Sequence, residues 1–127
     1  MARVVLDASA LLALLNSERG SHVVEESLPD AAISAVNLSE VVSKLSERDM
    51  PGAMVRTAVE ALDLDIRSFD ADLAFSAGLL RPATRGLGLS LGDRACLALG
   101  LLLSATILTT DRSWKKLKIG ATIRVIR

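Results

Sequence analysis

The stretch Arg3-Val4-Val5-Leu6-Asp7 is a short β-branched run that ends at an acid, and an apolar segment, residues 8–15, follows it at once. β-Branched residues favour a strand, and the longer apolar segment favours a helix. Short strands of this kind alternate with longer helices along the rest of the chain. This alternation predicts an α/β fold in which a mainly parallel sheet of about five short strands carries helices on both faces.

The other elements are expected from turn residues and apolar spacing. Further strands are expected at residues 31–33, 64–67, 106–109 and 122–126. Helices are expected at 21–28, from 34 or 37 to about 50, at 53–62 and 71–80, from 90 onward, and briefly after 111. Ser34 and Asn37 compete as the N-cap of the third helix. Pro82 should limit the helix before it, and residues 85–92 should form a loop.

Length and composition indicate one globular domain, residues 1–127, since domains commonly have about 100–150 residues. Half of the residues are hydrophobic and 24% are charged, which argues against disorder. The single cysteine, Cys96, excludes an internal disulfide and a cysteine-based zinc site, and the single His22 excludes multi-histidine metal sites. No segment resembles a signal peptide or is long enough to span a membrane, so we expect a soluble cytoplasmic protein.

The net charge is zero, but the charges are unevenly distributed along the chain. Residues 1–72 hold 13 acids and 6 bases, whereas residues 73–127 hold 2 acids and 9 bases. This asymmetry allows a basic surface for a polyanion, although a folded dipole without functional consequence explains it equally well. Because only 2% of the residues are aromatic, binding by extensive stacking on bases is disfavoured.

Four acids occupy a common kind of position in the predicted elements. Asp7 and Asp111 follow the first and fourth strands, Asp93 opens a buried helix, and Glu40 lies in the early turns of the third helix. In open parallel sheets, the carboxyl ends of the strands and the starts of the returning helices meet at one edge, where ligands bind. We therefore expect these four acids to converge on one cleft.

Helix capping is the alternative explanation for each acid taken alone. Ser90-Leu91-Gly92-Asp93 and Asn37-Leu38-Ser39-Glu40 both fit a capping box, and Asp7 and Asp111 are acceptable N-caps. Capping does not explain why these helix starts should share one edge. Clustered carboxylates repel one another unless a cation neutralises them, which favours a hard divalent ion, Mg²⁺ or Mn²⁺. Such an ion offsets the charge of a phosphodiester and activates water.

Four segments of the chain, in order, resemble the PIN-domain ribonucleases, and more narrowly the VapC-type toxins of type II toxin–antitoxin modules. The segments are Val4-Val5-Leu6-Asp7-Ala8-Ser9-Ala10, Ser39-Glu40-Val41, Gly88-Leu89-Ser90-Leu91-Gly92-Asp93-Arg94-Ala95-Cys96-Leu97-Ala98 and Leu108-Thr109-Thr110-Asp111-Arg112-Ser113-Trp114. The resemblance covers the whole chain, and its most specific parts are Leu89–Asp93 and Thr109–Trp114. It implies a single PIN-like domain.

The resemblance also implies an activity: an Mg²⁺-dependent endoribonuclease that cuts structured RNA, with tRNA expected, and that a VapB-type antitoxin restrains. Asp7, Glu40, Asp93 and Asp111 would be its acidic quartet. Asp7 and Asp93 are the strongest candidates for direct metal ligands. Asp111 would bind directly or through water, and Glu40 would orient the attacking water or hold a second ion. VapC-like proteins are typically dimers, so a homodimer is expected, through apolar surface on residues 53–62 and on Leu11, Leu12 and Leu15.

Residues beside the acids have two explanations each. Ser9 and Thr110 either hydrogen-bond the carboxylates or form caps and turns. Arg94, Arg112 and Lys115 are candidates for RNA phosphate contacts, but the arginines could pair with the neighbouring acids, and the lysine could lie on a solvated helix face together with Lys116 and Lys118. The glycines at 86, 88 and 92 do not have dinucleotide-binding spacing and are expected to let the chain approach the site closely.

Two other classes of protein compete with the ribonuclease. One is a non-catalytic α/β interaction module whose helix caps merely resemble a site. The other is a receiver-like domain that accepts a phosphoryl group on an aspartate. The receiver hypothesis requires two adjacent acids near the first strand, and Asp7 has no acidic neighbour. The interaction module therefore remains the main alternative.

Overall fold

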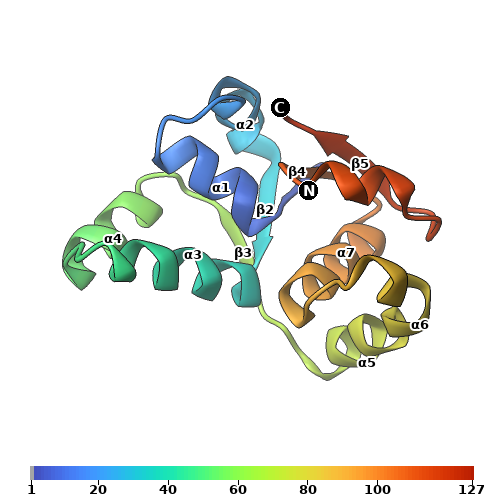
Figure 1. Cartoon of the computed structure of the whole chain (residues 1–127). Coiled ribbons are helices and arrows are strands. Elements are labelled where there is room, and N and C mark those ends of the chain that lie inside the picture. The colour runs from blue at the N-terminus through green and yellow to red at the C-terminus, as the bar shows by residue number, and fades with distance from the viewer. Residues whose placement is uncertain (1) are drawn as a thin grey trace.

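The computed structural model describes residues 2–127 and contains, within them, a five-stranded sheet in the order β3-β2-β1-β4-β5 (Figure 1). Every neighbouring pair of strands is parallel. The strands are β1 (Val4–Leu6), β2 (Ala31–Ser34), β3 (Asp65–Arg67), β4 (Thr106–Thr109) and β5 (Thr122–Val125). The α-helices are α1 (Ala8–Leu15), α2 (Ser21–Ser27), α3 (Ala35–Glu47), α4 (Gly52–Glu60), α5 (Ala71–Leu79), α6 (Arg81–Thr84) and α7 (Leu91–Leu103). Short 3₁₀ turns are η1 (Leu28–Asp30), η2 (Arg85–Leu87) and η3 (Arg112–Lys116).

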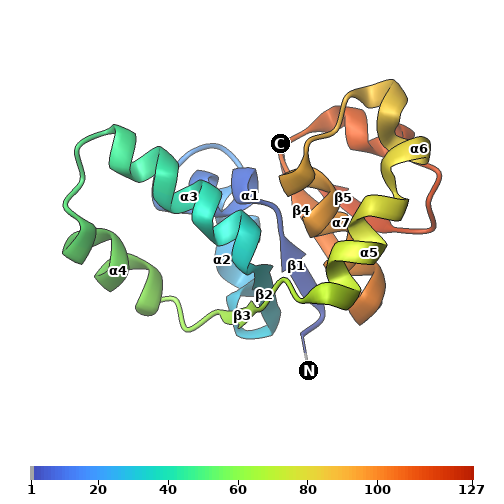
Figure 2. The same ribbon diagram turned by 90° about the horizontal axis from the view of Figure 1, so that it is seen from below.

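The sheet has an apolar core on each face because successive strand residues point to opposite sides. Leu6 and Leu108 pack with α1, α2, α3 and α4 on one face. Val5 and Ile107 pack with α5, α7 and η3 on the other. Figure 2 shows the two groups of helices on either side of the sheet. The predicted α/β fold, with a parallel sheet between two helical layers, is confirmed.

The predicted elements differ from the structure mainly around Pro82. Residues 81–84 form an extra helical turn, α6, which contains Pro82 and was not predicted, although α5 ends at Leu79, before Pro82, as expected. Proline is tolerated in the first turn of a helix because the N–H that it lacks would have no intrahelical partner there. At the start of α3, Ser34 is the N-cap and accepts a hydrogen bond from the backbone N–H of Val36 at 3.2 Å.

Part of the apolar surface predicted for self-association is buried, whereas Met54, within the predicted range 53–62, is 57% exposed on α4. Leu11 is fully buried, and Leu12 and Leu15 pack partly against the core beneath α1. Among the described residues, the most exposed large apolar side chains lie on α5, where Phe75 is 74% and Leu79 is 77% exposed. These two residues are one helical turn apart and therefore share a face. Among the helices in residues 2–127, none combines the length and the apolar character needed to cross a bilayer.

Candidate active site

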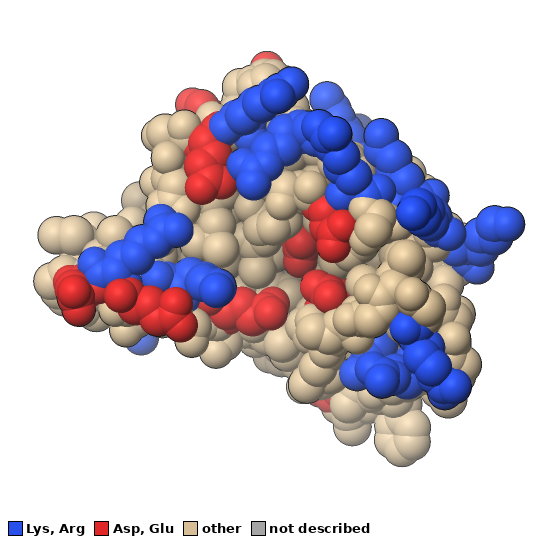
Figure 3. All heavy atoms as spheres, in the orientation of Figure 1, with Lys and Arg blue, Asp and Glu red and all other residues tan. Residues whose placement is uncertain are grey.

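Two adjacent strands bring the first and last parts of the site together. β1 and β4 pair in parallel with Leu6 opposite Leu108, so the residues that follow them lie side by side. The backbone N–H of Asp7 donates to the carbonyl of Leu108 at 3.0 Å, which fixes this register. The helices α3 and α7 pack against each other beyond this edge and carry Glu40 and Asp93 in their early turns. Figure 3 shows acidic side chains gathered in the middle of this face, with lysine and arginine side chains along one border.

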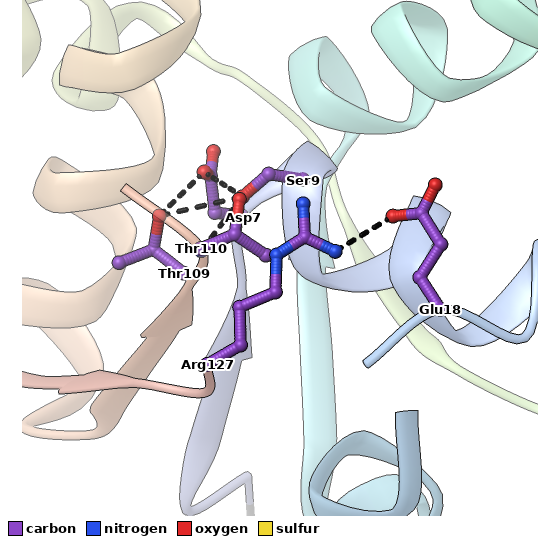
Figure 4. A network of polar contacts seen from close by, with 6 residues as sticks. All are labelled: Asp7, Ser9, Glu18, Thr109, Thr110 and Arg127. Atoms are coloured by element: carbon purple, nitrogen blue, oxygen red, sulfur yellow. Dashed lines mark hydrogen bonds and ion pairs between the residues drawn. The ribbon is translucent and has the colours of Figure 1, made fainter. Parts of the chain in front are cut away.

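The carboxylate of Asp7 is held by two hydroxyl groups (Figure 4). Ser9 Oγ donates to Asp7 Oδ2 at 2.7 Å, and Thr109 Oγ1 donates to the same oxygen at 2.9 Å. The backbone N–H of Thr110 donates to Ser9 Oγ at 3.0 Å. The backbone N–H of Asp111 donates to Thr109 Oγ1 at 3.1 Å. Both hydroxyls therefore occupy Oδ2, and Oδ1 stays outside this network.

Asp7 is in an environment that disfavours its charged form. The side chain is buried, with 5% of the residue exposed, and this burial is the main reason that its pKa rises to about 6. The hydrogen bonds from Ser9 and Thr109 act in the opposite direction, and the negative charges of Asp93 and Glu40 raise the pKa further. The carboxylates of Glu40, in α3, and Asp93, in α7, are thus close enough to act on Asp7, which follows β1.

The side chain of Asp93 takes part in a helix cap. Its Oδ2 accepts a hydrogen bond from the Ser90 backbone N–H at 2.9 Å, and its own backbone N–H donates to Ser90 Oγ at 3.1 Å. This capping box at the start of α7 is the one that the sequence predicts. The cap uses Oδ2, so Oδ1 lies outside it, and capping does not by itself prevent this carboxylate from contributing to a site.

Glu40 is held in a different way from the capping box expected at residues 37–40, and that prediction is wrong. Asn37 is not a cap but a fully buried residue inside α3. Its Nδ2 donates to Glu40 Oε1 at 2.8 Å and to the carbonyl of Gly92, in α7, at 2.9 Å. A Cβ on Gly92 would lie 2.5 Å from both carboxylate oxygens of Glu40. Gly92 thus allows the expected close approach, whereas nothing would lie within 4 Å of a Cβ at Gly86 or Gly88.

Asp111 lies at the same edge but is oriented by its own turn. Its Oδ1 accepts hydrogen bonds from the backbone N–H and the hydroxyl of Ser113, at 2.9 and 2.7 Å, and it caps η3. The residue is exposed. Its backbone is tied to the Asp7 network through Thr109. The main chain of the fourth acid is therefore linked to the Asp7 carboxylate through one hydroxyl group.

The three basic side chains that are predicted to contact RNA differ in their burial and in their hydrogen bonds. Arg94 Nη1 donates to the carbonyl of Ala77 in α5 at 3.1 Å, and its buried Nε has no hydrogen-bond partner in residues 2–127. Arg112 Nε donates to the carbonyl of Arg127 at 3.2 Å, on the exposed surface. Lys115 is exposed on η3. Arg127 in turn pairs with Glu18 at 2.9 Å (Figure 4).

The donor set suits a hard divalent cation. Within the part of the chain that the structure describes, no three Asp, Glu, His or Cys side chains are close enough to ligate one ion together. The acids nevertheless offer only oxygen atoms as metal ligands, and the negative charges of Glu40 and Asp93 act on Asp7. Mg²⁺ keeps several of its waters and is often held through them, so carboxylates that cannot all reach one ion directly can still hold it through those waters. Asp7, Glu40 and Asp93, with Asp111 at the rim, would hold it.

Two residues of this arrangement were missed by the reasoning from sequence. Thr109, not Thr110, provides the hydroxyl on Asp7, and Asn37 provides the amide on Glu40. A threonine at the carboxyl end of a strand, just before an acid, was the available signal for the first. The second was available from spacing, because residues 37 and 40 are three apart and share a helix face.

The sequence is similar to those of known proteins. The PIN domain family matches residues 4–120. Ribonuclease VapC42 from Mycobacterium tuberculosis is 31% identical over 106 residues, which cover 76% of this chain and 81% of the relative. A VapC ribonuclease from Mycobacterium bovis matches to the same extent.

Solved structures show the same fold. A toxin–antitoxin complex from Klebsiella pneumoniae has a chain with a TM-score of 0.75 and 21% identity, covering 95% of this chain and 96% of that one. In DNA-bound VapBC from Salmonella typhimurium, a chain with 16% identity has a TM-score of 0.74, and 98% of each chain is covered.

Proposed function

The chain belongs to the PIN-domain family and, within it, to the VapC ribonucleases, and from this we propose that it is a divalent-metal-dependent endoribonuclease toxin that cleaves structured RNA. The observation that carries this proposal is the mutual proximity of Asp7, Glu40 and Asp93 at the carboxyl edge of the sheet. Asp111 completes the acidic set at its rim. The proposed cofactor is Mg²⁺ or Mn²⁺.

Each residue has a defined task in this proposal. Mg²⁺ or Mn²⁺, when bound, would offset the charge of the scissile phosphodiester and supply an activated water. Asp7 and Asp93 would hold the ion through the carboxylate oxygens that the hydroxyl network and the helix cap leave free. Glu40 would help to hold the ion through the attacking water, which it would orient. Ser9 and Thr109 fix the orientation of the Asp7 carboxylate, and Thr110 supports Ser9 through its backbone N–H.

We propose structured RNA, with tRNA foremost, as the substrate. The support comes from the basic residues that border the acidic centre and from the scarcity of aromatic side chains for base stacking. Lys115 and Arg112 are the proposed phosphate contacts, because both are exposed on the turn that follows Asp111. Arg94 is a weaker candidate, since its guanidinium already contacts α5.

A VapB-type antitoxin is the proposed protein partner, as in the solved VapBC complexes that share this fold. An apolar groove of about 470 Å³ lies between α3 and α4. Leu38 and Val42, which line it, are one turn apart on α3 and share a helix face that differs from the face of Glu40. The groove can accept an apolar antitoxin segment, so we propose it as the antitoxin contact. We further propose a cytoplasmic homodimer, formed through the exposed face of α5.

The test of the proposed activity is to map RNA 5′ ends in cells after inducing the wild-type protein or the Asp93→Asn variant. Asparagine keeps an oxygen that can accept the Ser90 N–H, so the cap of α7 should survive while the carboxylate is lost. The control is Asp49→Asn, which makes the same change at an exposed acid between α3 and α4. We expect new 5′ ends with the wild type and the control, but not with Asp93→Asn. If the wild type produces none, the ribonuclease proposal fails and a non-catalytic interaction module replaces it.

A further inference from the structure

We propose that Asn37 is a positioning residue that fixes the Glu40 carboxylate against the first turn of α7. The carboxylate fits there because Gly92 has no side chain. This inference rests on the proposed function, because it assigns Glu40's position to the reaction. It concerns two residues that carry no charge and that do not belong to the acidic quartet.

The orientation of the Asn37 amide is determined by its neighbours. Its buried nitrogen lies 2.8 Å from Glu40 Oε1 and 2.9 Å from the Gly92 carbonyl oxygen. Both neighbours are acceptors, so only the NH₂ group can face them, and the flipped amide would place oxygen against oxygen. One side chain therefore joins the glutamate on α3 to the backbone of α7.

This orientation of the amide leaves its oxygen without a hydrogen-bond partner among the described residues. That oxygen, Asn37 Oδ1, is buried. An unsatisfied buried carbonyl is unfavourable, and an apolar side chain of similar size would avoid it. The amide thus contributes something other than packing, and its two hydrogen bonds identify that contribution as the placement of Glu40 on Gly92.

Gly92 restricts Glu40 from the other side. A methyl group there would overlap both carboxylate oxygens. These oxygens are the far end of a flexible side chain, so the glutamate would turn away while the α7 backbone stayed in place. Gly92→Ala therefore separates the position of Glu40 from the integrity of the fold.

Two variants and two matched controls test the proposal. Asn37→Leu removes the amide but keeps the number and branching of the side-chain heavy atoms, and Gly92→Ala fills the space. The controls are Ser34→Ala, which removes another polar contact at the start of α3, and Gly52→Ala. Gly52 lies in the first turn of its helix, and a Cβ added there would have nothing within 4 Å. We expect RNA cleavage to fall about 10–100-fold in the first pair, at nearly unchanged melting temperature, and to stay unchanged in the second.

A second readout uses the metal-free protein and needs no activity. The ¹³C resonance of the Glu40 side-chain carboxyl should shift in Asn37→Leu and in Gly92→Ala but not in the controls. An unchanged resonance in both would overturn the proposal, even if the wild type cleaves RNA. If the resonance shifts in both variants but the wild-type protein cuts no RNA, the contact is established and the proposed function is contradicted.

A double-mutant cycle distinguishes positioning from a structural role. If Asn37 acts through Glu40, Asn37→Leu should weaken Mn²⁺ binding by calorimetry in the wild type but have little further effect in Glu40→Gln. Equal weakening in both backgrounds would show that Asn37 supports the site independently of Glu40, and the proposal would be rejected.

Discussion

Thr109 donates its hydroxyl hydrogen to Asp7 Oδ2 at 2.9 Å, although the two residues are 102 positions apart in the chain. The contact exists because β1 and β4 are neighbours in the sheet and each ends at the same edge. Thr109 Oγ1 also accepts the backbone N–H of Asp111. One buried hydroxyl therefore links the most deeply buried acid of the site to the main chain of the most exposed one.

Thr109→Val should disturb both sides of this link while keeping the shape of the side chain. The loss of a hydrogen bond to the charged form should raise the pKa of Asp7 above its value of about 6, since Thr109 now lowers it. Mn²⁺ affinity should fall about 10–100-fold, as is usual when the partner of a metal-binding carboxylate is removed. NMR titration of the metal-free protein and calorimetry measure the two effects. Thr110→Val, which keeps the backbone N–H on Ser9, should change neither.

The stability of the metal-free protein should depend on pH through Asp7. Its pKa is about 6 in the folded protein, above its ordinary value of 3.8, so the folded state holds the proton more tightly. Stability from this group is therefore complete below about pH 4 and is lost as the pH rises to about 6, by about 3 kcal/mol in total. Chemical denaturation between pH 4 and 7.5 measures this loss.

Asp7→Asn provides the matched comparison for that pH dependence. Asparagine cannot ionise and retains an oxygen for the Ser9 and Thr109 hydroxyls, so the variant should be more stable than the wild type at pH 7.5 and similar to it at pH 4. Mn²⁺ should stabilise the wild type much more than the variant. A variant that is less stable at both pH values would mean that Asp7 has a structural role at the start of α1.

Self-association should depend on α5 rather than on the surfaces first expected from sequence. Phe75 and Leu79 are exposed on one face, with Ala74 and Gly78 beside them, so two antiparallel copies could place each large side chain over a small one. Phe75→Glu should convert a homodimer to a monomer in light scattering. Met54→Glu, at an exposed position on α4, should leave the dimer intact. Loss of the dimer in Met54→Glu alone would move the interface to α4.

Sequence reasoning predicted the sheet and the general position of the acids because both depend on local patterns. Each strand is a short apolar run, and each acid follows a strand or opens a helix. It failed at Thr109 and Asn37 because their roles depend on which elements become neighbours. Asn37 is a plausible helix cap by composition, and only the packing of α3 against α7 brings the Gly92 carbonyl within 2.9 Å of its amide.

The same reasoning left open whether Arg94 binds RNA or supports the fold, and the structure suggests a way to decide. Arg94 donates to the Ala77 carbonyl from a partly buried position, whereas Lys115 is exposed on η3. Arg94→Met should lower the free energy of unfolding by about 1–2 kcal/mol because a buried carbonyl loses its charged partner. Its effect on RNA affinity should be small.

Lys115→Met should have the opposite profile. Thermal stability should stay unchanged, while RNA affinity falls and the slope of log affinity against log salt concentration decreases by about one, as for the loss of one phosphate contact. Both variants are best measured with the cleavage-deficient Asp93→Asn protein, so that RNA stays intact during titration. If Arg94→Met reduces the salt slope without destabilising the protein, Arg94 is a phosphate contact, and its bond to Ala77 does not hold the side chain away from RNA.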